Sequence, residues 1–161
     1  MTRRVRTLER AQDLPLPRDA VFPFFAEAGN LEAITPPELR FRFVTPLPIA
    51  MRAGARIEYR LSLFRVPFGW TTEITGWDPP HGFVDEERRG PFALWRHEHR
   101  FEDIDGGAAT RMRDTVHYAL PLSPLGDLAH PLVRARLDRI FDFRAAEIGR
   151  RIAAGAWTTH G

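Results

Sequence analysis

The chain has 161 residues, of which 43% are hydrophobic and 27% are charged, and it contains 12 Phe and 4 Trp. A chain of this length can bury the core of one domain and is too short for two, and its aromatic content argues against intrinsic disorder. Cysteine is absent, which excludes disulfide frameworks, thiolate zinc sites and thiol nucleophiles.

No apolar run reaches the roughly 20 residues of a membrane-spanning helix, so we expect no stable insertion into a membrane. The basic residues at the start are not followed by an apolar stretch of the kind found in signal peptides, so we expect a cytoplasmic protein. All 23 basic residues are Arg, and 21 acidic residues leave a net charge of +2. Because Arg is spread along the chain and interleaved with Asp and Glu, we expect no nucleic-acid partner.

The N-terminal part of the chain predicts two strands separated by two short helices. Residues 5–13 have the pattern of a strand, and residues 17–25 that of a helix. A second short helix is predicted over residues 31–34, because Pro36-Pro37 then interrupts the chain. Residues 40–45 predict the second strand.

The rest of the chain predicts a meander of strands followed by one long helix. Between residues 55 and 119, alternating apolar and polar residues broken by turns are typical of antiparallel strands. Asp127 is the predicted N-cap of a helix that runs to about Ala154. Its apolar positions recur at helical spacing and are Val133, Leu137, Ile140, Phe141, Ile148 and Ile152. The predicted order is therefore one strand, two short helices, six strands and one long helix.

A turn at Gly106-Gly107 fixes the register of the last hairpin. On the face that carries the large apolar groups, the predicted pairs are Trp95–Tyr118, His97–Val116, His99–Asp114 and Phe101–Met112. The other face pairs charged residues such as Glu102 with Arg111. We therefore expect the first face to point into the core.

Two earlier hairpins can be aligned in the same way. A turn over residues 65–68 places Tyr59 opposite Ile74, Leu61 opposite Thr72 and Leu63 opposite Trp70. The next turn, over residues 78–81, places Phe83 opposite Gly76 and Asp85 opposite Ile74, so Asp85 falls on the inner face. A sheet with one apolar face needs a cover, and the C-terminal helix is the available one.

The inner face is unusual because it carries polar residues, namely Tyr59, Thr72, Asp85, His97, His99, Asp114 and Tyr118. A buried charge needs a partner, so we predict a cross-strand pair between His99 and Asp114 and a contact between Asp85 and His97. The group could be a structural network that fixes the register. It could also be the polar part of a small-molecule site. It could instead supply a general acid or base, with His99 and Asp114 as the candidate catalytic residues.

A metal site is a further reading, because His97 and His99 lie on one strand face with Asp114 or Asp85 as a possible third ligand. His-x-His is a short pattern with little specificity, so we expect no metal. No nucleotide-binding or hydrolase motif occurs, and we expect no cofactor.

Several phrases of the sequence resemble the START-like, or SRPBCC, superfamily, within it an uncharacterised bacterial ligand-binding branch. The phrases are Asn30-Leu31-Glu32 with Ile34-Thr35-Pro36-Pro37, Gly54 to Tyr59, Trp77-Asp78-Pro79-Pro80, Phe83 to Glu86, Gly90-Pro91-Phe92, Trp95 to Phe101, Met112 to Tyr118 and Leu120-Pro121, with the final helix over 134–144. Related branches resemble polyketide cyclases and dehydrases, lipid-transfer domains, quinone-binding proteins and chaperone co-activators.

The resemblance implies an α+β helix-grip fold of order β-α-α-β6-α, in which a curved antiparallel seven-stranded sheet wraps around a long C-terminal helix. It implies one domain over residues 1–161, with an ordered core from about 4 to 154, a short C-terminal tail and an internal apolar cavity between sheet and helix. It implies no universal catalytic residue.

We expect a non-enzymatic protein that binds, transports or senses a small hydrophobic or amphipathic molecule, such as a lipid, a polyketide or a quinone. One alternative is a cyclase or dehydratase-type enzyme that uses the His–Asp pair, and another is a protein-interaction module. The protein is expected to be a monomer or a homodimer. The predicted ligand-binding residues are Tyr59, Trp70, Asp85, Trp95, His97, His99, Phe101, Met112, Asp114, Tyr118, Leu137 and Phe141.

Overall fold

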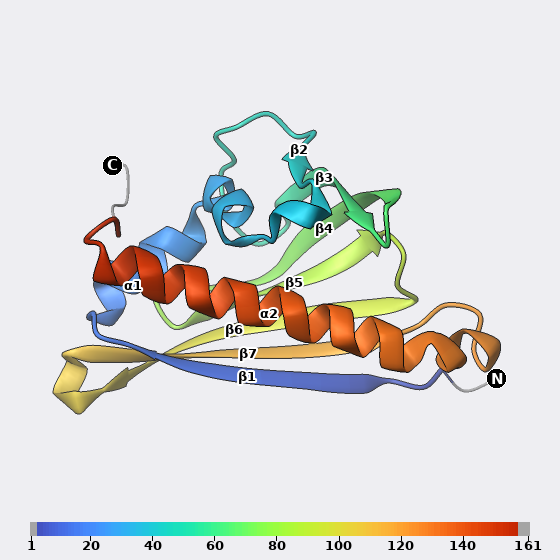
Figure 1. Cartoon of the computed structure of the whole chain (residues 1–161). Coiled ribbons are helices and arrows are strands. Elements are labelled where there is room, and N and C mark those ends of the chain that lie inside the picture. The colour runs from blue at the N-terminus through green and yellow to red at the C-terminus, as the bar shows by residue number, and fades with distance from the viewer. Residues whose placement is uncertain (1–2, 158–161) are drawn as a thin grey trace.

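The protein consists of one antiparallel sheet and a long helix that lies against it (Figure 1). The structure, a computed structural model, describes residues 3–157. The sheet has seven strands in the order β1-β7-β6-β5-β4-β3-β2. Its strands are β1 (Arg6–Leu14), β2 (Arg42–Phe43), β3 (Arg56–Leu63), β4 (Val66–Asp78), β5 (Gly82–Arg89), β6 (Leu94–Ile104) and β7 (Ala109–Ala119). The helices are α1 (Arg18–Ala26), α2 (His130–Ala153) and the 3-10 helices η1 (Ala28–Ile34), η2 (Pro37–Leu39), η3 (Asp105–Gly107) and η4 (Leu125–Ala129).

The predicted register of the β6–β7 hairpin is confirmed. Trp95 pairs with Tyr118, His99 with Asp114 and Phe101 with Met112. The connecting turn needs Gly106 and Gly107, because both have positive φ angles of 66° and 91°. β1 then pairs with the free edge of β7 along its whole length.

The predicted register of the β3–β4 hairpin is wrong. The turn contains only Phe64 and Arg65, so Tyr59 lies opposite Trp70 instead of Ile74. Both turn residues have positive φ angles, 51° and 64°, as in the two-residue turns whose twist matches that of the flanking strands. The shift is an even number of residues, so each side chain stays on its predicted face.

A bulge between β4 and β5 makes part of the predicted β4–β5 register wrong. Asp85 lies opposite Ile74 as predicted, but Gly76 pairs with Val84 instead of Phe83. The register shifts by one residue between Ile74 and Gly76. A bulge of this kind adds a residue to one strand and cannot be read from alternation alone.

The boundaries of two predicted elements also differ from those in the structure. The second strand is only Arg42–Phe43, where residues 40–45 were expected. Asp127 is not the cap of the long helix, which begins at His130 after η4 and has no side-chain cap. The Asp127 carboxylate instead accepts hydrogen bonds from Arg6 Nη1 at 2.7 Å and Ser123 Oγ at 2.6 Å.

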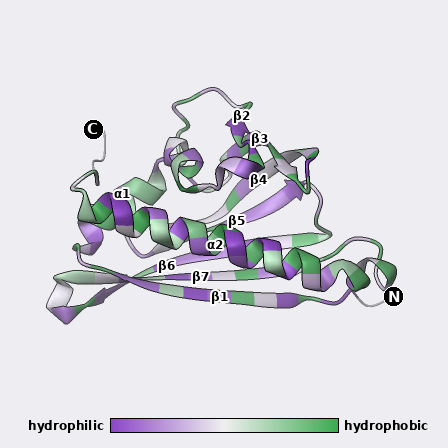
Figure 2. Ribbon diagram, in the orientation of Figure 1, coloured by the Kyte–Doolittle hydropathy of each residue, from purple (hydrophilic) through white to green (hydrophobic). Residues whose placement is uncertain are grey.

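The core lies between the sheet and the helices. Phe22 and Phe25 of α1 pack edge-on or tilted against Phe101 of the sheet, with ring centroids 5.5 and 5.3 Å apart. Trp157 stacks on Phe24 at 4.1 Å and donates a hydrogen bond to the Ala20 carbonyl, so the tail also contributes to packing. Figure 2 shows apolar and polar residues alternating along α2, as expected of a helix with one buried face. Within residues 3–157 no helix is both long and apolar enough to span a membrane.

Candidate functional site

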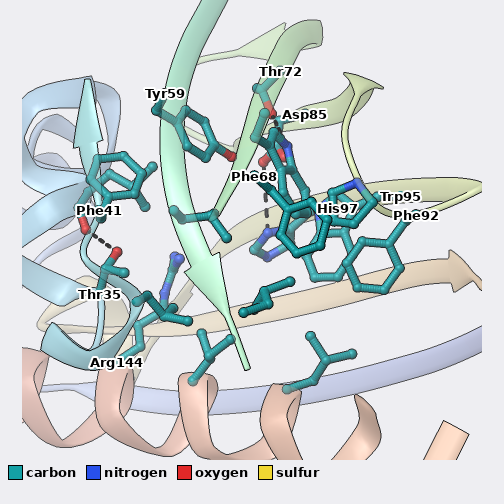
Figure 3. Close-up of a pocket in the computed structure, with 18 of the residues that line it drawn as sticks. Thr35, Phe41, Tyr59, Phe68, Thr72, Asp85, Phe92, Trp95, His97 and Arg144 are labelled. Atoms are coloured by element: carbon teal, nitrogen blue, oxygen red, sulfur yellow. Dashed lines mark hydrogen bonds and ion pairs between the residues drawn. The ribbon is translucent and has the colours of Figure 1, made fainter. Parts of the chain in front are cut away.

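A cavity of about 530 Å³ lies inside the fold, between the sheet, η1 and α2. Its walls come from β3 to β6, from η1 and from the inner face of α2, and they are mainly aliphatic and aromatic (Figure 3). Small-molecule sites in proteins usually enclose about 300–1,000 Å³ and have mostly apolar walls with a few polar groups. The cavity has both the size and the composition of such a site.

Eight of the twelve predicted ligand-binding residues line this cavity: Tyr59, Trp70, Asp85, Trp95, His97, His99, Leu137 and Phe141. The other four, Phe101, Met112, Asp114 and Tyr118, do not line it and are buried. Phe101 is covered by the aromatic rings of α1, and the Tyr118 hydroxyl lies 3.0 Å from His130 Nε2 at the start of α2. Alternation along the strands correctly predicted that these side chains lie on the inner face of the sheet. The helices pack over them there, so they do not reach the cavity.

The polar residues of the inner face form a connected network. His97 Nε2 lies 2.7 Å from Asp114 Oδ1, and His99 Nε2 lies 2.6 Å from Asp85 Oδ2. The two imidazole rings stack with their centroids 3.7 Å apart. Each histidine therefore has its own carboxylate.

The hydrogen bonds join other pairs than the predicted ones, although the predicted pairs also lie within 4 Å of each other. The backbone register places His99 opposite Asp114 and His97 opposite Asp85, as expected. The side chains nevertheless bond along the diagonals, and the directly opposed distances are longer, 3.5 Å for His99 Nδ1–Asp114 Oδ1 and 3.8 Å for His97 Nδ1–Asp85 Oδ2. Strand twist brings diagonal neighbours within reach of long side chains, which explains the exchange.

Arg144 of α2 is a site residue that the sequence reasoning missed. It is 8% exposed, lines the cavity and reaches from α2 toward the sheet, where its Nη2 lies 3.6 Å from Asp114 Oδ1 (Figure 3). Its Nε is buried without a hydrogen-bond partner. A signal was present, because Arg144 falls on the same helical stripe as Leu137, Phe141 and Ile148, where an apolar residue is expected.

The charges of this network follow from its surroundings. Burial acts to raise the pKa of Asp114, but the charge of Arg144 and the hydrogen bond from His97 hold that pKa well below its usual range. Burial likewise acts to raise the pKa of Asp85, and the hydrogen bond from His99 outweighs it and lowers the pKa. Burial lowers the pKa of His99 to about 4, so its imidazole is neutral near pH 7. Both carboxylates are therefore ionised at neutral pH.

Nε2 of His97 is the nitrogen that donates to Asp114, because an ionised carboxylate can only accept. In the neutral form of this imidazole the lone pair is therefore on Nδ1. Nδ1 is 3.8 Å from Asp85, which is beyond hydrogen-bonding distance. A carboxylate that orients an imidazole in this way is common where the imidazole acts as a base or a hydrogen-bond acceptor.

A second polar feature lies beside Phe92, at the connection between β5 and β6. Glu87 is half-buried, accepts a hydrogen bond from the Phe92 amide at 3.2 Å and leaves Oε2 without a partner. Burial raises the pKa of Glu87 to about 7. Gly90 permits this contact, because a Cβ there would lie 2.6 Å from the Glu87 carboxyl carbon. Phe92, which Glu87 positions, lines the cavity.

Asp85, His97 and His99 offer donor atoms that lie within 4.8 Å of one another, a grouping that can hold a metal ion. The Asp85–His99 distance of 2.6 Å is a hydrogen bond, whereas two ligands of a tetrahedral zinc with bonds of about 2.0–2.1 Å lie roughly 3.3 Å apart. The geometry therefore fits a protonated network better than a metal centre.

Other wall residues come from parts of the chain with no periodic pattern. Leu31, Ile34 and Thr35 belong to η1 and its end, and Phe92 belongs to the β5–β6 connection. Phe41 precedes the short β2. Because alternation assigns faces only within strands, no sequence signal places these side chains on a cavity wall.

No protein-family model matches this sequence, and no curated protein is significantly similar to it. Solved structures with the same fold are numerous. The ZhuI aromatase/cyclase from Streptomyces sp. R1128 is 15% identical with a TM-score of 0.73, covering 92% of this chain and 96% of that one. Norcoclaurine synthase from Thalictrum flavum is 10% identical with a TM-score of 0.70, covering 97% and 99%.

The same fold also occurs as part of a longer chain. A nucleoside-diphosphate sugar epimerase from Corynebacterium glutamicum is 23% identical with a TM-score of 0.63, and the match covers 91% of this chain but only 29% of that one. These likenesses, together with the seven-stranded antiparallel sheet and its C-terminal helix, show the expected helix-grip fold.

Proposed function

We propose that this helix-grip protein binds a small hydrophobic or amphipathic molecule in its internal cavity and acts as a carrier or a sensor of that molecule. The observation that carries the proposal is the cavity of about 530 Å³ with apolar walls. Burying apolar ligand surface there stabilises a complex by roughly 25 cal/mol per Å². Neighbours of the same fold include an aromatase/cyclase and a norcoclaurine synthase.

The polar wall favours a ligand with a neutral oxygen. Asp85 and Asp114 contribute two negative charges and Arg144 one positive charge, while His99 is neutral. The network therefore has no surplus of positive charge to attract an anion. A carbonyl oxygen could accept from Arg144, and a hydroxyl could donate to His97 Nδ1. A ketone, phenol or quinone-like group on an apolar body fits better than a free fatty acid.

The test uses a variant that fills the cavity. Ala28 is buried and lines the cavity, so Ala28→Phe should reduce its volume, whereas Ala146→Phe on the exposed face of α2 adds the same side chain outside it. Binding of an environment-sensitive apolar dye, measured by fluorescence titration, should be at least about tenfold weaker in Ala28→Phe and unchanged in Ala146→Phe. Equal binding by both variants, with the fold checked by circular dichroism, would contradict the proposal.

A second candidate function is an enzyme of the cyclase or dehydratase type, and the orientation of His97 favours it. Asp114 holds His97 by Nε2, so in a neutral imidazole the lone pair of Nδ1 would accept a proton from the carbon next to a carbonyl group. This assigns the base to His97, where the sequence favoured His99. A His97→Asn variant of an enzyme should keep ligand binding and lose turnover, whereas a carrier has no turnover to lose.

A further inference from the structure

Exposed apolar side chains surround the mouth of the cavity. The turn between β3 and β4 and the segment before α2 supply nearly all the exposed residues of its lining, with Glu27 as the exception. We define the mouth patch as Phe64, Leu122, Leu125, Leu128 and Leu132, which are 41%, 84%, 75%, 81% and 58% exposed. The guanidinium of Arg136 in α2 lies 5.0 Å from the centre of the Phe64 ring and so connects the β3–β4 turn to α2. The β3–β4 turn and the segment before α2 lie toward the right-hand side of Figure 1.

Folding alone does not account for these residues. Phe64, Arg65 and Leu122 have φ angles of 51°, 64° and 57°, in the left-handed region that favours Gly or Asn. A two-residue hairpin turn usually contains Asn-Gly. All three side chains are exposed, and apart from the contact of Phe64 with Arg136 no packing within residues 3–157 compensates for the backbone strain. Strained residues with exposed apolar side chains are typical of functional surfaces.

The leucines are held by an ordered loop. The Gly126 amide donates to the Leu122 carbonyl at 2.8 Å, and Ser123 donates to Asp127 at 2.6 Å. Arg6 anchors the same carboxylate to β1. A side chain at Gly126 would overlap the Pro121 carbonyl oxygen, so the tight loop requires glycine. The loop therefore displays Leu122, Leu125 and Leu128 in a defined arrangement.

Positive charge is in excess around the mouth patch. Between Leu120 and Leu137 the sole acidic residue is Asp127, which pairs with Arg6. Arg134 in the same segment pairs with Asp138, whereas Arg136 lies over Phe64 and has no ion pair among the described residues. From Arg60 to Thr72 the β3–β4 hairpin contains Arg60 and Arg65 and no acidic residue. Exposed leucines bordered by arginines are typical of surfaces that rest on anionic lipid headgroups.

We propose that the mouth patch docks the protein on an anionic membrane surface, from which the cavity takes up or releases its ligand. The proposal rests on the proposed function, because a molecule suited to an apolar cavity partitions into a bilayer and would pass through the mouth without crossing water. Leucine dominates the patch, whereas hot spots between proteins are enriched in Trp, Tyr and Arg and poor in Leu. The composition thus favours a lipid surface over a protein partner.

The test is sedimentation of the untagged protein with vesicles of phosphatidylcholine alone and of phosphatidylcholine with phosphatidylglycerol at about three to one. The protein should bind the anionic vesicles, and binding should weaken as salt is raised. Leu125→Asp combined with Leu128→Asp should lower the bound fraction by at least about tenfold. Leu47→Asp is the matched control, because Leu47 is 50% exposed and lies outside the patch, and it should bind like the wild type.

Fluorescence titration with the apolar dye separates the two proposals. If the dye binds but wild-type protein does not sediment with either vesicle, membrane docking is refuted and the cavity function stands. If the double variant and the wild type sediment equally, the mouth patch is not the docking surface. A third outcome is that wild-type protein does not bind either vesicle but self-associates in light scattering, and that the double variant does not self-associate. The patch is then a protein interface, and the membrane proposal is wrong. Loss of dye binding in the wild type would refute the cavity function itself.

Discussion

Glu87, which holds the amide of the cavity-lining Phe92, offers the sharpest test of how burial shifts a pKa in this protein. Its carboxyl is half-buried, accepts one hydrogen bond from the Phe92 amide and has one oxygen without a partner. Burial therefore raises its pKa from 4.5 to about 7, so the folded protein holds this proton more tightly than the unfolded chain does. Replacing Glu87 by Gln removes the charge and keeps the size of the side chain.

The sign and the size of the effect follow from proton linkage. A group with a raised pKa in the folded state contributes stability that is fully present below its unfolded pKa and is lost as pH rises through about 7. The difference between 4.5 and about 7 corresponds to about 3 kcal/mol in full. Because solvent reaches part of the side chain, we expect a loss of about 2 kcal/mol in wild-type stability between pH of about 5 and about 8.

Urea unfolding followed by circular dichroism measures this loss. The quantity to compare is the unfolding free energy of Glu87→Gln minus that of wild type. This difference should be about 2 kcal/mol larger at pH of about 8 than at pH of about 5. Glu9→Gln is the control, because Glu9 is exposed on β1 and should follow the wild-type curve at both pH values. If Glu87→Gln also follows the wild-type curve, the carboxyl ionises as freely in the folded protein as in the unfolded chain, and the reasoning from burial is wrong.

Three further predictions concern the buried network and the loop at the mouth. Arg144→Met should destabilise the protein by about 3 kcal/mol in thermal or urea unfolding, because it leaves the Asp114 charge without its cation, and adding Asp114→Asn should recover part of that loss. Elemental analysis of untagged protein should find no stoichiometric zinc or iron, because Asp85 and His99 already share a hydrogen bond of 2.6 Å, and a full metal occupancy would contradict this. Gly126→Ala should cost about 1–3 kcal/mol, because the added methyl overlaps a carbonyl oxygen, and an unchanged melting temperature would show that the loop can rearrange.

Local chemistry explains why much of the sheet could be predicted. Gly106 and Gly107 adopt the positive φ angles of their turn at little energetic cost. In β6 and β7, apolar and polar residues alternate so that a single pairing register keeps most of the large apolar side chains on one face. The β3–β4 hairpin lacks such a signal, because Phe64-Arg65 is an unusual pair in a two-residue turn. The predicted turn is centred two residues too late along the chain, which shifts every predicted pairing of this hairpin by four residues.

The cavity could be predicted only in part, for a related reason. Strand parity correctly directed Asp85, His97 and His99 inward, and these residues line the cavity. Parity also directed Met112 and Asp114 inward, yet neither lines it. Alternation reports the face of a sheet on which a side chain lies, and the position of the covering helices decides whether that side chain meets a cavity or other side chains.

The sequence by itself determined the fold class, the order of the elements and the register of the β6–β7 hairpin, because turn residues and alternation act over a few neighbouring positions. Only the tertiary structure decided which histidine bonds which carboxylate. That choice depends on the twist between adjacent strands, which favours the diagonals, and on Arg144, which α2 brings to Asp114 from 30 residues further along the chain. Such contacts join elements distant in sequence, so no local pattern can specify them.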